Sequence, residues 1–213
     1  AFPAHVTDEL IDVIANEEKI CKYIDLPLQH FSDHILKDMN RGISQQETFQ
    51  LIAKIRDRIP GASLRTTFIV GFPGETEEDF NGLLRFVIQT QFERLGVFVY
   101  SKEEGTPAYH LPFQVPAFLK KKRLDTLMQT QQGIAQKLHQ RFLGKKLEIL
   151  IEERQKPAED SKDQGPVYLG RSEYDAPEVD GLVYVRSAKP LKPGDFVRVE
   201  ITDTYEYDLA GEA

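Results

Sequence analysis

The sequence has very little cysteine: Cys21 is the only one among its 213 residues. A single cysteine excludes an internal disulfide and, with no signal peptide at the start, favours an intracellular, cytoplasmic protein. It also excludes a zinc site or an iron–sulfur cluster built from several cysteines of this chain. No apolar run approaches the roughly 20 residues of a membrane-spanning helix, so we expect no membrane insertion. Cys21 itself is expected to pack like a small hydrophobe beside a strand.

Acidic residues outnumber basic residues, and their excess is unevenly distributed along the chain. The whole chain carries a net charge of −7. From residue 145 onward there are 10 basic and 16 acidic residues, a net of −6, so the part before it is nearly balanced. An acidic C-terminal part disfavours a nucleic-acid backbone as partner and favours a basic one. The alternative is that the charge only keeps the surface soluble.

The most informative stretch is 64–80, LRTTFIVGFPGETEEDF. Its β-branched and aromatic run at 66–70 predicts a buried parallel strand. A Gly-Pro-Gly turn at 71–74 then breaks the strand, and Thr76 with Asp79 predicts a capped helix. In α/β folds, ligands bind at the C-terminal ends of the strands, where this turn lies.

The turn lacks both glycine motifs of phosphate sites. Four acids crowd the helix start and would repel a phosphate: Glu75, Glu77, Glu78 and Asp79. A loop with free backbone groups and a carboxylate suits a ligand with an ammonium group or hydroxyls. Equally open is the interpretation that the glycines only make room and the acids only cap.

The rest of residues 1–143 alternates between strand and helix patterns. Strands are predicted at 22–28 and 94–101, and helices at 6–16, 32–40, 45–59 and 117–143, the third opened by a Ser44–Glu47 capping box. This order implies parallel strands with right-handed crossovers, enough for half of a barrel. The basic run at 120–123 is expected to be the solvated start of an amphipathic helix.

After Gly144 the pattern changes to short alternating β-prone runs separated by turns. They lie at 147–151, 167–170, 182–185, 196–201 and 205–209. Five such strands in about seventy residues predict a small closed β-barrel of the OB kind. The polar segment 153–166 is expected to be a mobile loop. We therefore divide the chain into a barrel half (1–114), a linking helix (115–144) and the β-barrel (145–213).

Four motifs resemble the radical-SAM methylthiotransferases over essentially the whole chain. They are PLQH at 27–30, LRTTFIVGFPGETEEDF at 64–80, VFVYS at 97–101 and GRSEYDAPEVDGLVYV at 170–185. The second motif is shared by the protein-modifying and tRNA-modifying branches. The fourth is similar to the RimO-type branch, which modifies a ribosomal protein.

This resemblance implies an α/β plus all-β fold: the C-terminal half of a partial (β/α)6 radical-SAM barrel, TIM-like, followed by a five-stranded TRAM domain. It implies methylthiolation of the β-carbon of an aspartate in small-subunit ribosomal protein twelve. The implied cofactors are S-adenosylmethionine and two 4Fe-4S clusters, one cleaving the cofactor to a radical and the other serving sulfur transfer.

The sequence departs from the family in its cysteines, because the C-x-x-x-C-x-x-C motif and the other three cluster cysteines are absent. The chain also opens at Ala1, as after a cut within a longer protein. We therefore expect a C-terminal fragment that holds no catalytic residue and no metal, binds no cofactor by itself and is inactive alone. Its half-sheet would expose a strand edge and an apolar face, so we also expect non-native self-association.

By resemblance, the strand ends line the cofactor pocket. Gln29 and His30 lie where the ribose or methionine end would bind, and Ile69 would pack on the adenine. Arg65 and Thr67 share a strand face, and Arg65 pairs either with the cofactor carboxylate or with a structural acid. The other cofactor-binding candidates are Gly71, Phe98, Tyr100 and Ser101. Each has a structural alternative: loop capping, plain core or turn geometry.

The TRAM domain binds nucleic acid in the tRNA-modifying relatives, but here it is acidic. We hypothesise that Asp175, Glu178 and Asp180 dock the basic ribosomal protein and that the chain makes no direct nucleic-acid contact. The alternative is an acidic turn. The competing functions are a tRNA methylthiotransferase, an RNA-binding TRAM module using Tyr168, Tyr174 and Tyr184, and a cofactor-independent barrel enzyme.

Overall fold

The computed structural model describes residues 2–155 and 166–213. They form two compact units, one ending at Ile134 and the other beginning at Ala135. Among these residues, none of the helices is both long and apolar enough to cross a bilayer. Most of the segment predicted to be a mobile loop (153–166) lies outside the described residues.

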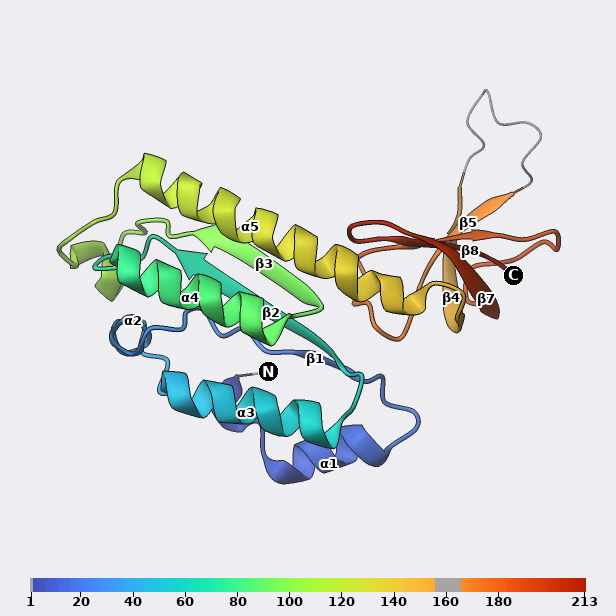
Figure 1. Ribbon diagram of the computed structural model, residues 1–213, viewed down its shortest axis with the longest axis horizontal. Coiled ribbons are helices and arrows are strands. Elements are labelled where there is room, and N and C mark those ends of the chain that lie inside the picture. Colours follow the sequence, from blue (N-terminus) through green and yellow to red (C-terminus); the bar gives the residue numbers. More distant parts are fainter. Residues whose placement is uncertain (1, 156–165) are drawn as a thin grey trace. The chain divides into compact units, whose positions relative to one another are not determined.

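The first unit is a three-stranded parallel sheet with helices between its strands (Figure 1). In chain order its elements are α1 (Asp8–Asn16), β1 (Tyr23–Asp25), α2 (Asp33–Asp38), α3 (Gln45–Arg58), β2 (Ser63–Val70), α4 (Glu77–Thr90), β3 (Arg94–Val99) and the start of α5 (Ala117–His139). Two short 3-10 turns, η1 (Pro3–His5) and η2 (Pro107–His110), complete it. The strand order β1-β2-β3 confirms the predicted half barrel.

The central strand β2 is buried on its helix-facing side. Leu64, Thr66, Phe68 and Val70 are at most 1% exposed. Phe68 packs edge-on against Phe86 of α4, which lies over β2 in Figure 1. Each such buried apolar side chain stabilises the fold by roughly 1.5–3 kcal/mol. The alternate residues Arg65, Thr67 and Ile69 therefore point to the opposite face of the sheet.

Side-chain caps fix three helix starts where the sequence predicts them. Thr7 accepts from the Leu10 amide, and Ser44 and Thr76 open capping boxes with Glu47 and Asp79. These caps satisfy backbone amides that would otherwise lack partners.

The sequence pattern predicts apolar stripes that include Leu10 and Val13 in the helix at 6–16 and Ile88 in the helix after Thr76, and these stripes are partly wrong. In α1 the buried residue is Ile11, while Leu10 and Val13 are exposed. In α4 Phe86 is buried and Ile88 is 50% exposed. Successive helix residues differ by about 100° around the axis, so a choice displaced by one residue turns a side chain from core to solvent.

Strand β1 is shorter than predicted because Pro27 has no amide hydrogen to donate. The chain rejoins the sheet at Gln29, whose amide donates to the Thr67 carbonyl at 2.8 Å and whose carbonyl accepts from the Ile69 amide at 2.8 Å. Gln29 has φ 72°, a conformation that non-glycine residues rarely adopt. Cys21, just before β1, is exposed, so the expectation that it packs as a small hydrophobe is wrong.

The second unit is a closed five-stranded barrel, which confirms the predicted OB-like domain. Its strands are β4 (Lys146–Arg154), β5 (Val167–Arg171), β6 (Val183–Arg186), β7 (Phe196–Thr204) and β8 (Leu209–Glu212), in the order β4-β5-β6-β8-β7. Alternating residues from all five strands fill the interior, among them Ile149, Tyr168, Val185 and Ile201.

Two boundaries in this unit differ from prediction. The helix predicted to reach 143 ends at His139 and continues as the 3-10 turn η3 (Gln140–Phe142). The last strand was predicted at 205–209 but begins at Leu209. The Tyr205 amide donates to the Asp208 carbonyl at 2.9 Å, which closes a turn over those residues instead.

Candidate functional site

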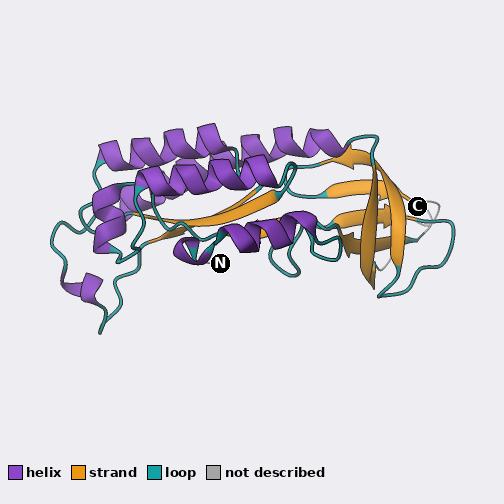
Figure 2. Ribbon diagram, turned by 90° about the horizontal axis from the view of Figure 1, so that it is seen from below, coloured by secondary structure: helices purple, strands orange, loops and turns teal. Residues whose placement is uncertain are grey.

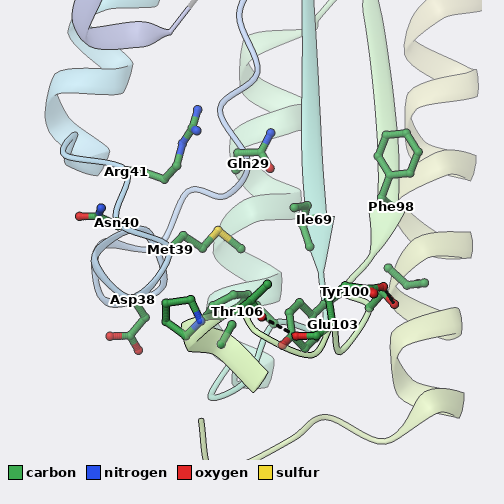
Figure 3. A pocket seen from close by; sticks show the side chains of 15 residues that line it. Gln29, Asp38, Met39, Asn40, Arg41, Ile69, Phe98, Tyr100, Glu103 and Thr106 are labelled. Carbon is green, nitrogen blue, oxygen red and sulfur yellow. Dashed lines mark hydrogen bonds between the residues drawn. The ribbon is translucent and has the colours of Figure 1, made fainter. Parts of the chain in front are cut away.

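A cavity of about 530 Å³ lies at the C-terminal ends of β2 and β3, within the first unit (Figure 3). Small-molecule sites in proteins commonly occupy about 300–1,000 Å³. The strand ends of an α/β fold are also where its ligands bind. This is therefore the candidate site, and its walls come from three segments of the chain.

The first wall follows β1 and α2. It consists of Gln29 and the segment 38–41. Met39 points toward the centre of the cavity, whereas Asp38 and Asn40 point away from it (Figure 3). The backbone of Gln29 is fixed by its two hydrogen bonds to β2, so its amide side chain is presented from a rigid position.

The second wall is apolar and comes from β2, β3 and the turn after β2. Ile69 and Phe98 are cross-strand neighbours in the parallel register. Phe72 packs edge-on against Tyr100, with ring centroids 5.1 Å apart. Phe98 is 60% exposed. Such a surface suits a flat apolar or heteroaromatic group.

The third wall is the loop after β3. Ser101 donates to Glu103 at 2.6 Å, and Thr106 donates to the Glu103 carbonyl at 2.7 Å. These bonds bring Glu103, Thr106 and the start of η2 to the rim of the cavity.

Two buried polar atoms on the lining residues have no hydrogen-bond partner: Nε of Arg41 and the hydroxyl of Tyr100. Burial lowers the pKa of the Arg41 guanidinium and raises that of the Tyr100 phenol, to which Glu103 adds. Arg41 Nη2 donates to the Pro27 carbonyl at 2.6 Å, and its guanidinium lies over the Phe2 ring. Unsatisfied buried donors are rare in native proteins, so these two groups are candidates for hydrogen bonds to a ligand.

Arg41 is the one cationic residue among the described residues that line the cavity. It was not among the residues predicted to bind the cofactor. A weak signal was present, since the residue follows a short helix that itself follows the Gln29 loop. Nothing in the sequence, however, shows that this residue lines the cavity. Phe72 was likewise missed, because it lies inside a turn.

Five of the predicted cofactor-binding residues line this cavity: Gln29, Ile69, Phe98, Tyr100 and Ser101. His30, Arg65, Thr67 and Gly71 do not. Arg65 pairs with Asp25 across the strands at 3.1 Å, so of its two predicted partners the structure shows the structural acid. Thr67 is 9% exposed on the same strand face.

Glu75 does not serve as a free carboxylate for a ligand. Its side chain is fully buried, accepts from the Gly71 amide at 2.5 Å and pairs with Arg123 at 2.9 Å. Arg123 is 4% exposed. The basic run at 120–123 is therefore not wholly solvated, because one of its residues reaches back to a turn 48 positions earlier.

The acidic segment of the second unit is mostly structural. Asp175 is 5% exposed and accepts from the Ser172 hydroxyl at 2.6 Å. Asp180 accepts from the Ala176 amide at 2.9 Å. Glu178 is exposed and has φ 61°. Of the three residues proposed to dock a basic partner, only Glu178 is classed as exposed.

Two of the three tyrosines considered for stacking on RNA bases already pack against other residues of the second unit. Tyr168 is 2% exposed, and its hydroxyl accepts from the Leu191 amide. Tyr174 packs against Phe142 with centroids 5.2 Å apart. Tyr184 lines a smaller cavity of about 250 Å³ with Arg186, Asp203 and Glu212, a mixed rather than basic surface. No group of three or more His, Cys, Asp or Glu residues within 2–155 and 166–213 has a metal-binding arrangement.

Two family models match the chain. Residues 2–87 match the radical SAM superfamily and residues 143–213 match the TRAM domain. The chain is 52% identical over 212 residues to the ribosomal protein uS12 methylthiotransferase RimO of Caldanaerobacter subterraneus, and 48% identical over 210 residues to that of Aquifex aeolicus. The chain is similar to these RimO proteins over its whole length.

The match covers 100% and 99% of this chain but only 46% and 47% of those two RimO proteins, so the chain spans about half the length of these curated relatives. Among solved structures, coproporphyrinogen III oxidase (HemN) from Escherichia coli, a radical SAM enzyme, is similar with a TM-score of 0.50 and 16% identity. That similarity covers 80% of this chain and 45% of HemN. It supports the fold alone.

Proposed function

We propose that this chain is the C-terminal part of a radical-SAM methylthiotransferase that modifies the β-carbon of an aspartate in ribosomal protein uS12. The observation that carries the proposal is the cavity at the strand ends, whose described lining residues include one cationic side chain, that of Arg41. The chain around this cavity is 52% identical to a RimO protein. S-adenosylmethionine is the ligand that this cavity would hold.

The cavity residues fit S-adenosylmethionine. Its amino-carboxylate needs a cation, and Arg41 offers a buried N–H without a partner. Its adenine suits the apolar wall of Ile69 and Phe72. Gln29, held in a fixed backbone conformation, offers an amide to the ribose hydroxyls. When bound, the cofactor supplies the radical chemistry, and this chain orients it and excludes water.

The described residues do not fit an iron–sulfur cluster. A four-iron cluster takes about four thiolate ligands, while the chain has one cysteine, and that cysteine is exposed and far in sequence from the cavity residues of β2 and β3. In this proposal the cluster ligands lie outside this chain, and the chain has no methylthiotransferase activity by itself.

A basic protein substrate fits the second unit better than RNA does. The unit has a net charge of −6 from residue 145 onward. Two of its candidate stacking tyrosines are packed. Acidic surface attracts a basic protein and repels phosphate. The acidic residues of this unit, with Glu178 exposed among them, are the proposed docking surface.

Ligand binding tests the assignment of Arg41. Calorimetry on a full-length enzyme containing this chain would compare S-adenosylhomocysteine, which carries the amino-carboxylate, with methylthioadenosine, which lacks it. We expect Arg41→Gln to weaken S-adenosylhomocysteine about tenfold, as for loss of one charged hydrogen bond, and to leave methylthioadenosine unchanged. Arg65→Gln is the matched control and should spare both ligands. Equal losses for both ligands, or a larger loss in Arg65→Gln, would reject the assignment.

Activity tests the substrate. A full-length enzyme containing this chain, purified anaerobically, would be incubated with S-adenosylmethionine, sulfide, reductant and either uS12 or a tRNA transcript. We expect the mass gain of a methylthio group on uS12 only. A gain on the tRNA would replace the proposed substrate with that of the tRNA-modifying branch.

A further inference from the structure

One buried carboxylate behind the cavity joins three separate segments of the first unit. Glu75 Oε2 accepts from the amides of Gly71, at 2.5 Å, and Phe72, at 3.3 Å. Its Oε1 binds Arg123 Nη1 at 2.9 Å, and the same guanidinium donates to the Glu75 carbonyl at 3.2 Å. The carboxylate thus closes the turn that carries Phe72, a cavity residue, and ties it to α5.

The third segment is the loop after β1. His30 is fully buried, and its Nε2, which has no hydrogen-bond partner, lies 3.4 Å from Glu75 Oε2. Its Nδ1 accepts from the Ser32 amide at 3.0 Å, so in the neutral ring the proton is on Nε2 and faces the carboxylate. His30 directly follows Gln29, the cavity residue with φ 72°.

Helix α5 makes a second contact with the same turn. Lys120, one helical turn before Arg123, donates to the Tyr100 carbonyl at 2.8 Å. A Cβ placed on Gly71 would lie 2.4 Å from Lys120 Cγ, so helix and turn are in close contact. The backbone positions of Phe72 and Tyr100 are therefore both held from behind by α5.

We infer that Glu75 is a positioning residue that sets the apolar wall of the cavity, where Phe72 packs edge-on against Tyr100. Burying a carboxylate is costly unless it is fully paired, and apolar residues close a turn equally well. A buried carboxylate whose two oxygens are both paired, as those of Glu75 are, instead specifies one geometry. The identity of the ligand in this inference rests on the proposed function, but the positioning does not.

The chain contains a matched control for this inference. Glu93 is 6% exposed and pairs with Arg56 at 2.8 and 2.9 Å. It also accepts from the Leu64 amide at 2.9 Å. Both carboxylates thus pair with an arginine from a helix and accept a hydrogen bond from a backbone amide at one end of β2. Glu93 binds at the start of the strand, whereas Glu75 binds just after its end, beside the cavity.

Amide hydrogen exchange measured by NMR separates the two without any ligand. We expect Glu75→Gln to speed exchange at Gly71 and Phe72 at least tenfold and to leave Leu64 within twofold. Glu93→Gln should do the reverse. If both variants speed exchange at both ends of β2, the network is only a general stabiliser and the inference is wrong. Should Glu75→Gln fail to fold, Arg123→Lys, which keeps the charge but not the forked geometry, is judged by the same criterion.

Binding of S-adenosylhomocysteine supplies the second readout. We expect Glu75→Gln to raise the Kd at least fivefold and Glu93→Gln to leave it within twofold. The two variants should lower the thermal midpoint of unfolding by similar amounts, so that the difference in Kd does not reflect a difference in stability. Equal Kd changes in the two variants would overturn the inference. These affinities are measured in a full-length enzyme containing this chain. If the unaltered full-length enzyme binds no S-adenosyl compound, the proposed function fails, and the exchange measurement alone decides whether Glu75 positions the apolar wall.

Discussion

Lys120 lies over the ring of Tyr100, with Nζ 4.7 Å from the ring centroid, while the same ammonium donates to the Tyr100 carbonyl at 2.8 Å. One side chain of α5 thus holds both the backbone and the ring of a cavity residue. A cation over an aromatic face adds about 0.5–2 kcal/mol, depending on its solvation. The stem of this lysine passes Gly71, and this close approach leads to the first prediction.

Gly71→Ala should destabilise the first unit by about 1–3 kcal/mol, because the new methyl group overlaps Lys120 and the backbone is in a left-handed conformation. Gly71 has φ 75°. Urea unfolding would measure the loss. Lys120→Ala removes the atoms that clash, so Gly71→Ala should cost less in that background than in the unaltered protein. An equal cost in both backgrounds would show that Lys120 is not the obstacle.

The capping residue Asp79 should make stability depend on pH. Burial alone would raise the pKa of Asp79, but hydrogen bonds from Ser32 and Thr76 outweigh it and hold the pKa below its ordinary value. Because the folded state lowers the pKa, the stabilisation is complete above the unfolded value, about 3.9, and is lost as the pH falls through the lower folded value.

Asp79→Asn should therefore reduce the free energy of unfolding at pH 7 by about 0.5–1 kcal/mol. The difference from the unaltered protein should shrink below about pH 4. Urea unfolding at pH 7 and pH 3 measures it. Glu77→Gln, in the same helical turn but outside the capping box, is the control. A difference that stays constant between the two pH values would contradict the assigned role.

Glu178→Lys should weaken binding of uS12 without unfolding the barrel, because this carboxylate is exposed. We expect a threefold to tenfold rise in Kd at low salt, which narrows at high salt as charges are screened. Reversal of Asp175 would instead disrupt the turn that it holds with Ser172. Unchanged uS12 affinity in Glu178→Lys, with an unchanged thermal midpoint, would remove this residue from the proposed docking surface.

Self-association should be measurable by light scattering. In the described residues β1 and β3 are the outer strands of the sheet, and Phe98 and Val99 at the end of β3 are 60% and 42% exposed. Such an edge promotes pairing between copies. We expect a mass above that of a monomer at high concentration, which Phe98→Ser lowers. A strictly monomeric protein would count against this expectation.

Most of the fold could be predicted from patterns of residues that lie close together in the sequence. Thr76 with Asp79 and Ser44 with Glu47 were predictable because a capping box is complete within four residues. The barrel was predictable from alternating residues and turns, and its closed strand order agrees. The residues of the candidate site were harder to predict from the sequence. Five strand-end residues were found because the resemblance to the radical-SAM methylthiotransferases implies that the strand ends line the cofactor pocket.

The missed residues depend on contacts between distant parts of the chain. Arg123 reaches Glu75 across 48 positions, and a run of four basic residues gives no sign of which one turns inward. Arg41 donates to the Pro27 carbonyl, although α2 lies between the two residues in the sequence. The pattern of polar surface residues in α2 gives no sign of this contact. Arg65 was placed on the correct face, but the side chain opposite it, Asp25, could be known only from the strand register.

The position of β8 has a consequence for the order in which the barrel folds. This four-residue strand pairs in parallel with β6 and antiparallel with β7, and so lies between them. During synthesis the other four strands emerge first, with β6 and β7 each lacking a neighbour. The sheet becomes continuous only when Leu209–Glu212 has left the ribosome, so this domain closes after translation of its last strand rather than progressively.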